Sequence, residues 1–123
     1  HPANINKING IAKKYNLKVI SDTAQSPLAY DGNSMAGTSS DIGGFSLNFH
    51  KHINTGEGGI LVTNCDKLAL RMRLIRNHGE ACVEDLGVEN IANMIGHNFR
   101  LGEIECSMGI EQLKKLDLNL KRH

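Results

Sequence analysis

The sequence predicts an α/β fold, in which a mixed and mostly parallel sheet is flanked by helices. An amphipathic helical pattern is followed at once by a short β-branched run, the order found in the second half of a parallel βαβ unit. Two further apolar runs lie about ten residues apart, and two more helical patterns follow them. With 123 residues, the chain fits one domain that can bury a core.

The first elements along the chain are a helix, a strand and a loop. A helix is expected over residues 4–16, "NINKINGIAKKYN", because its isoleucines share one face and Asn4 is a plausible N-cap. The run "LKVISD" (17–22) is expected to be a buried strand that ends at Asp22. Residues 26–40 are rich in Gly, Ser, Asn and Asp and are therefore expected to form a loop.

Two more strands and a helix are expected in the middle of the chain. The strands are "DIGGFSL" (41–47) and "GGILVTN" (58–64). Because the residues between them show no helical pattern for a parallel crossover, we expect an antiparallel pair. The helix is expected over residues 65–79, with Asp66 near its start and Gly79 as its stop signal.

The C-terminal part is expected to begin irregularly and end in a helix. Residues 80–98 show weak periodicity, whereas residues 101–122 are expected to form one long amphipathic helix in which Cys106 is a small core residue. The apolar stripe of that helix consists of Leu101, Ile104, Met108, Leu113, Leu116 and Leu120.

The composition excludes several classes of function. A formal net charge of +1 argues against binding nucleic acid through bulk charge. The chain has no apolar run long enough to span a membrane and no signal-peptide pattern. The widely spaced Cys65, Cys82 and Cys106 match neither a metal site nor a disulfide framework, which favours reduced thiols. We therefore expect a cytoplasmic protein with no metal ion and no nucleic-acid or membrane partner.

Lys51 is the first candidate for chemistry, because it follows an apolar strand in "FSLNFHKHINTGEGG" (45–59). Burial disfavours the ammonium form of lysine, and a neutral amine is what Schiff-base chemistry requires. The commoner alternative is a loop lysine that points into solvent. The glycines of "TGEGG" (55–59) match no nucleotide-binding loop and are expected to form a tight turn with positive φ.

Three other side chains could serve the same ligand. Asp22 ends a predicted strand, where a carboxylate could pair with a cationic ring nitrogen or could simply cap a turn. Gln25 lies three residues further on. Ser46 could donate its hydroxyl to a phosphate, or could simply be solvated.

Four segments together resemble one known family. These are "SDTAQ" (21–25), the stretch 45–59, "RLIRNHG" (73–79) and "GHNFRLGEIECSMGIEQLKKLD" (96–117). In this order they resemble the DegT/StrS-type nucleotide-sugar aminotransferases, which are pyridoxal-phosphate (PLP) enzymes of fold type I. The resemblance implies that residues 1–123 are part of the large, PLP-binding domain. It also implies that the N-terminal part of that domain and the small C-terminal domain lie outside the chain.

The resemblance implies a role for each candidate. Lys51 matches the lysine that binds PLP as a Schiff base and then moves a proton. Asp22 matches the aspartate that keeps the pyridine nitrogen protonated, and Gln25 a glutamine beside the ring. Ser46 matches a phosphate-binding serine. Asn98 matches a residue that reaches the cofactor phosphate of the neighbouring subunit, so that a homodimer with shared sites is expected.

The implied reaction moves an amino group, with glutamate as donor, to a keto group of a nucleotide-linked sugar in surface polysaccharide or glycan biosynthesis. Two alternatives remain. Some relatives are nucleotide-sugar dehydratases with histidine at the position of Lys51, and the chain could also be an inactive fragment or an interaction module. His50 and His52 depart from the family pattern, and their roles stay open.

Overall fold

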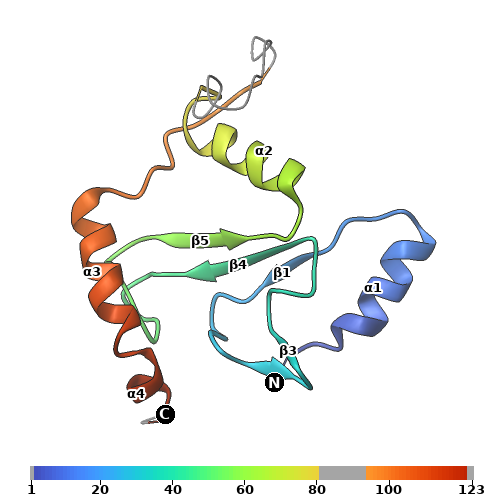
Figure 1. The fold of residues 1–123 in the computed structure, drawn as a ribbon, viewed down its shortest axis with the longest axis horizontal. Coiled ribbons are helices and arrows are strands. Elements are labelled where there is room, and N and C mark those ends of the chain that lie inside the picture. Colours follow the sequence, from blue (N-terminus) through green and yellow to red (C-terminus); the bar gives the residue numbers. More distant parts are fainter. Residues whose placement is uncertain (1, 81–93, 122–123) are drawn as a thin grey trace. The chain divides into compact units, whose positions relative to one another are not determined.

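The computed structural model describes residues 2–80 and 94–121. The chain divides into two compact units, one made of residues 1–64 and 102–123 and the other of residues 65–101. Figure 1 follows the elements through both units. None of the described helices is long and apolar enough to cross a membrane.

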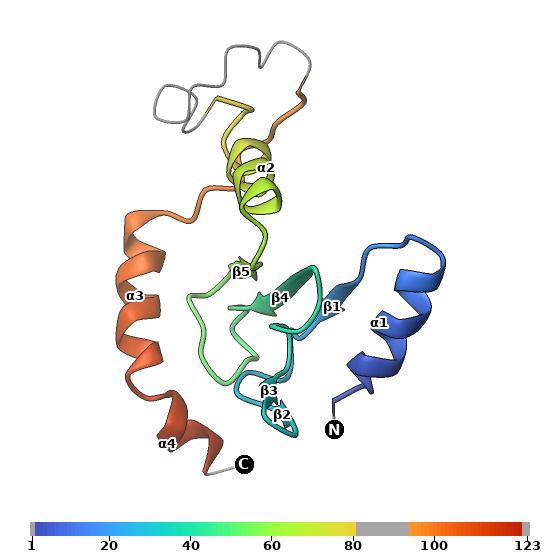
Figure 2. The same cartoon turned by 45° about the vertical axis from the view of Figure 1, so that its right-hand side comes forward.

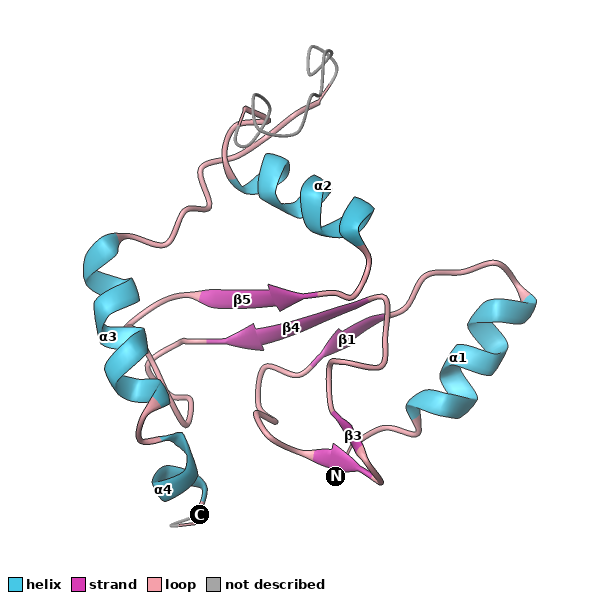
Figure 3. Ribbon diagram, in the orientation of Figure 1, coloured by secondary structure: helices cyan, strands magenta, loops and turns pink. Residues whose placement is uncertain are grey.

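The first unit is built on a three-stranded mixed sheet with the order β1-β4-β5 (Figure 3). The strands are β1 (Ile20–Asp22), β4 (Ile42–Ser46) and β5 (Gly59–Val62). β1 pairs with β4 in parallel, and β4 pairs with β5 in antiparallel orientation. The antiparallel pair predicted from the short connection is therefore confirmed.

Helix α1 (Ile5–Lys14) leads into β1. The predicted N-cap is confirmed, because the Oδ1 atom of Asn4 accepts the amide hydrogen of Lys7 at 3.0 Å. The strand is shorter than the predicted 17–22, and Ile20 is 70% exposed. The expectation of a buried strand is wrong for this structure, because β1 lies at the edge of the sheet.

The expected loop 26–40 contains a small hairpin, which corrects the prediction. Strands β2 (Tyr30–Asp31) and β3 (Ser34–Met35) pair in antiparallel orientation around Gly32, which has a φ of 59°. Strands of two residues are too short to show an alternating pattern, so only the "DGN" turn indicated them.

Gly43 in β4 lets the chain after the hairpin pack directly on the sheet. A Cβ at this position would overlap the carbonyl group of Gly37, whose own φ is 87°. The next residue is less restricted, because a Cβ at Gly44 would meet the Cδ2 atom of Leu61 at an ordinary 3.5 Å. The two glycines interrupting the predicted strand therefore have different structural roles.

The C-terminal segment forms two helices, α3 (Glu103–Leu113) and α4 (Leu116–Leu120), not the single predicted one. The apolar period runs on across the break, so the sequence pattern could not reveal it. Tertiary contacts hold α4: Leu116 is buried, and the Nδ2 atom of Asn119 donates to the carbonyl of His52 at 2.9 Å.

Helix α3 lies beside the carboxyl end of β4 in both views (Figures 1 and 2). A Cβ at Gly109 would meet the Cγ2 atom of Thr55 at 3.3 Å, so the helix packs against the chain that follows β4. Much of the predicted apolar stripe is nevertheless exposed, including Ile104 and Met108. Cys106 is half-buried and not a core residue.

In its described part, the second unit contains helix α2 (Asp66–Arg76) and residues 94–101. The predicted stop signal is confirmed: Gly79 has a φ of 79°, and its amide donates to the carbonyl of Leu74 at 2.8 Å. Asn77 forms an isolated antiparallel bridge with Asn98. Residues 80–98 were predicted to be irregular. Residues 81–93, which include Cys82, lie outside the residues that the structure describes.

Candidate active site

Two of the predicted residues end neighbouring parallel strands. Asp22 is the last residue of β1 and lies opposite Gly44, while Ser46 is the last residue of β4. The carboxyl ends of parallel strands meet at the same edge of a sheet, which is where ligands bind in α/β proteins. β1 and β4 run in the same direction (Figure 1), so Asp22 and Ser46 lie at the same end of the sheet.

Lys51 lies in a loop that leaves β4 and returns to β5. The loop is closed at its base by Leu47, whose amide donates to the carbonyl of Gly58 at 2.9 Å and whose carbonyl accepts the amide hydrogen of Thr55 at 2.9 Å. Leu47, Ile53 and Thr55 are buried, so the loop has a small core of its own. The predicted tight turn is also present, since Gly56 has a φ of 85°.

Lys51 and Ser46 line the same cavity, which has a volume of about 140 Å³. Thr23 and Ala24, the residues directly after Asp22, line it too, and Leu113 and Leu116 contribute apolar walls. Lys51 itself is half-buried. As a whole residue, Lys51 is therefore neither buried nor fully exposed in its loop.

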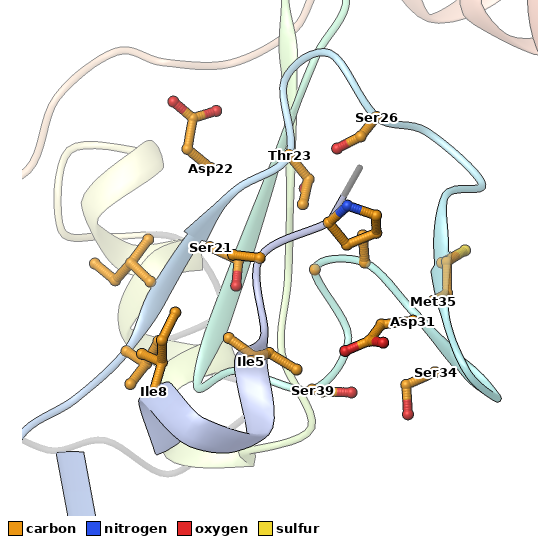
Figure 4. Close-up of a pocket in the computed structure, with 16 residues that line it drawn as sticks. Ile5, Ile8, Ser21, Asp22, Thr23, Ser26, Asp31, Ser34, Met35 and Ser39 are labelled. Carbon is orange, nitrogen blue, oxygen red and sulfur yellow. The ribbon is translucent and has the colours of Figure 1, made fainter. Parts of the chain in front are cut away.

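Asp22 is exposed, and its Oδ1 atom accepts the amide hydrogen of Ala24 at 3.0 Å. It contributes to a different cavity of about 300 Å³ next to α1 and the hairpin. Figure 4 shows its carboxylate pointing away from the side chains of Ser21 and Thr23. This follows the alternation along a strand and puts the carboxylate on the opposite face of β1. Of these two cavities, Asp22 thus lines one and Lys51 the other.

The remaining predicted residues are placed less closely. Gln25 is exposed on the turn after β1 and lines neither of these two cavities. Asn98 is exposed in the second unit. His52 lines the cavity of Lys51, whereas His50 is exposed, and its ring lies 3.7 Å from that of Phe49 between centroids.

Two residues of the lysine loop were missed by sequence reasoning. The Oγ atom of Ser46 accepts the amide hydrogen of Asn48 at 3.1 Å, and the Nδ2 atom of Asn48 donates to the Oε1 atom of Glu57 at 2.7 Å. An oxygen that accepts in this way still has its own hydroxyl hydrogen to donate. The sequence signal that could have indicated them is Glu57, a lone glutamate between glycines, nine residues after Asn48, which follows the end of β4.

An ion pair fixes the opposite end of the two parallel strands. The Lys18 ammonium lies 2.7 Å from Asp41, and the other oxygen of that carboxylate accepts the amide hydrogen of Val19 at 2.9 Å. The hydrogen bond from Lys18, followed by that from Val19, lowers the pKa of Asp41 below its ordinary value of 3.8. The register of β1 and β4 places Asp22 and Ser46 at the same end of the sheet. The ion pair anchors this register at the other end, where both strands begin.

Known proteins resemble this chain in sequence and in fold. Residues 1–123 match the DegT/DnrJ/EryC1/StrS aminotransferase family. The chain is 35% identical over 118 residues to the UDP-4-amino-4,6-dideoxy-N-acetyl-beta-L-altrosamine transaminase of Campylobacter jejuni, which covers 96% of this chain and 31% of that protein.

Solved structures share the fold. An aminotransferase from Psychrobacter cryohalolentis superposes with a TM-score of 0.83 at 30% identity, covering 93% of this chain and 31% of that one. A GDP-4-keto-6-deoxymannose-3-dehydratase, solved with a trapped PLP–glutamate geminal diamine, gives a TM-score of 0.78 at 32% identity over 94% of this chain and 33% of its own. The chain thus spans about a third of the length of these relatives.

Proposed function

The chain belongs to the DegT/DnrJ/EryC1/StrS aminotransferase family, and on this basis we propose that it is part of a PLP-dependent nucleotide-sugar aminotransferase. The enzyme moves an amino group from glutamate to a keto group of a nucleotide-linked sugar. The observation that carries the proposal is the placement of Asp22 and Ser46 at the ends of two neighbouring parallel strands, with Lys51 in the loop that follows β4. The names of the similar proteins, a transaminase of a UDP-linked amino sugar and an enzyme solved with PLP and glutamate, support it.

The residues at this edge fit PLP by their chemistry. The amine of Lys51 would hold the cofactor covalently, the hydroxyl of Ser46 would donate to its phosphate, and the carboxylate of Asp22 would accept from its ring nitrogen. Gln25 would lie beside the ring. When bound, PLP supplies the electron sink that lets an amino group change partners.

The protein's own groups perform the remaining work. The Nζ atom of Lys51 takes a proton from the reacting carbon of the substrate and returns it on the product. The buried Leu116 and the neighbouring Leu113 give the cavity that Lys51 lines an apolar wall. The negative charge of Asp22 would keep a proton on the ring nitrogen of the bound cofactor.

The proposal extends to the whole protein. Residues 1–123 are the central part of its large, PLP-binding domain. The enzyme is a cytoplasmic homodimer that acts in surface polysaccharide or glycan biosynthesis, and Asn98 of each subunit reaches the cofactor phosphate of the other. Asn98 is exposed in its unit, as a residue that serves a neighbouring subunit must be.

The assignment of Lys51 is tested by chemical trapping in the full-length enzyme. After loading with PLP and reduction with borohydride, peptide mapping is expected to find the pyridoxyl group on Lys51. Lys51→Ala should abolish trapping and lower turnover by at least ~10²–10⁴-fold, the usual worth of a general acid–base group. Lys14→Ala, which removes an exposed lysine of α1, serves as the control. A pyridoxyl group on Lys13, Lys14 or Lys18 would contradict the assignment.

A dehydratase is the second candidate function, because a dehydratase is among the similar structures. Lys51 stands where such relatives have histidine, which favours transamination. Incubation with glutamate and a panel of UDP- and GDP-linked keto sugars separates the two reactions. Formation of 2-oxoglutarate in proportion to aminated sugar supports the aminotransferase, whereas loss of water without amino transfer overturns it.

The shared site is tested by mixing two inactive homodimers. Lys51→Ala subunits supply Asn98, and Asn98→Ala subunits supply Lys51. If sites are shared, random exchange gives heterodimers with one intact site, so about a quarter of wild-type turnover returns. No recovery, with heterodimers demonstrated by native mass spectrometry, would show that Asn98 acts within its own subunit. An Asn98→Ala homodimer that is active before mixing would show that Asn98 has no role.

A further inference from the structure

Asn48 is hydrogen-bonded through all four of its polar groups within the segment that carries Ser46 and Lys51. Its amide donates to the Oγ atom of Ser46 at 3.1 Å, and its carbonyl accepts the amide hydrogen of Lys51 at 2.9 Å. Its side-chain Oδ1 atom accepts the amide hydrogen of His50 at 3.1 Å, and its Nδ2 atom donates to the Oε1 atom of Glu57 at 2.7 Å. One residue thus connects the phosphate-binding and the covalent candidates.

The backbone of Glu57 is held within the loop, while its side chain is exposed. Its carbonyl accepts the hydroxyl hydrogen of Thr55 at 2.8 Å, and Thr55 is buried at the base of the loop. The side-chain amide of Asn48 therefore connects the part of the loop that leaves β4 to the part that returns to β5. A bond from an amide to a carboxylate is charge-assisted and stronger than a neutral one.

We propose that Asn48 is a positioning residue that holds the turn between Ser46 and Lys51 in one geometry, with Glu57 as its anchor. This inference rests on the proposed function, because Lys51 and Ser46 are the groups that the turn positions. The side chain of lysine has four flexible methylene groups, so its reach is set by where its backbone begins. A shift of about 1 Å in a positioned catalytic group can cost roughly 10²-fold in rate.

An exchange of chemical groups between the two residues gives a sharp test. Asn48→Asp keeps the acceptor for the His50 amide but sets two carboxylates against each other. Glu57→Gln keeps an oxygen that accepts from Asn48. In the double variant Asn48→Asp/Glu57→Gln, the new amide donates to the new carboxylate, so the bond returns with reversed polarity and unchanged net charge.

The first measurement is amide hydrogen exchange of the apoenzyme, which needs no cofactor. In Asn48→Ala and Asn48→Asp, we expect the amides of His50 and Lys51 to exchange about tenfold faster than in the wild type, because their acceptors are lost or displaced. The double variant should recover most of the protection. Asn54→Ala is the matched control, since it removes only a 3.4 Å contact to Gly56 in the same loop.

The second measurement is the rate at which Lys51 becomes trapped by borohydride in the presence of PLP. The same order is expected. Trapping should be slower than in the wild type in Asn48→Ala and Asn48→Asp, should recover in the double variant and should be unchanged in Asn54→Ala. The unfolding midpoints of all variants should be similar. A double variant no better than Asn48→Asp, or exchange in Asn48→Ala equal to wild type, would overturn the inference. A wild-type enzyme that never traps PLP on Lys51 would refute the proposed function instead, while hydrogen exchange still decides the role of Asn48.

Discussion

Asp22 combines an exposed carboxylate with a local hydrogen bond that does not depend on its charge. Asp22→Asn is therefore expected to keep the fold, because an amide oxygen can still accept from Ala24. Turnover at saturating PLP should fall by roughly 10³-fold, since a neutral amide cannot hold a proton on the ring nitrogen. Asp31→Asn, the same change at another residue lining the 300 Å³ cavity, is the control. Near wild-type turnover in Asp22→Asn would refute the role.

Asp41 makes the stability of the sheet depend on acid. Its pKa is lower in the folded than in the unfolded chain, so its contribution is fully present above the ordinary value of 3.8 and is lost as the pH falls through the folded pKa. Asp41→Asn should therefore flatten the fall of the unfolding midpoint below about pH 4. Thermal unfolding at closely spaced pH values measures this, and identical acid limbs in both proteins would contradict the linkage.

At the scale of elements, β4 tolerates a side chain at one of its adjacent glycines and not at the other. A Cβ at Gly43 would overlap the backbone of Gly37, which cannot move without displacing the chain after the hairpin. Gly43→Ala should lower the free energy of unfolding by about 3 kcal/mol or more. Gly44→Ala, whose Cβ has room, should be neutral or stabilise by up to about 1 kcal/mol. Equal effects in denaturant unfolding would show that the close contact is not limiting.

At the scale of the whole molecule, the described surface carries many large apolar side chains. Exposed examples come from the sheet, the lysine loop and α3, namely Ile20, Leu61, Phe49 and Ile104. The relatives have about three times the length of this chain, and the resemblance implies that the N-terminal part of the PLP-binding domain and the small C-terminal domain lie outside it. We therefore expect residues 1–123 expressed alone to self-associate and to bind PLP weakly, because a partial shell leaves the ligand mobile.

Light scattering and a PLP titration of the isolated segment check this prediction. The full-length enzyme under the same conditions is the control. A monomer that forms a stable yellow one-to-one complex with PLP would show that residues 1–123 already contain a complete site.

Elements with strong local signals were predictable from the sequence. Asn4 at the start of α1 and Gly79 after α2 could be predicted because each acts through a property of a single residue. Asn4 supplies a side-chain acceptor, and Gly79 adopts a positive φ. The antiparallel pair β4–β5 followed from a connection too short and too irregular for a helical crossover. The candidate site residues came from motifs in order along the chain, and their roles stay predictions.

By itself, the sequence determined the main helices and strands, the direction of one strand pair, the turn at Gly56 and the family to which the chain belongs. Only the tertiary structure decided the break between α3 and α4, the edge position of β1, the separate cavities of Asp22 and Lys51, and the contact of Asn48 with Glu57. The physical reason is the distance along the chain over which each interaction acts. Caps, turns and periodicity act within a few residues, whereas burial and cross-loop hydrogen bonds depend on which distant segments meet.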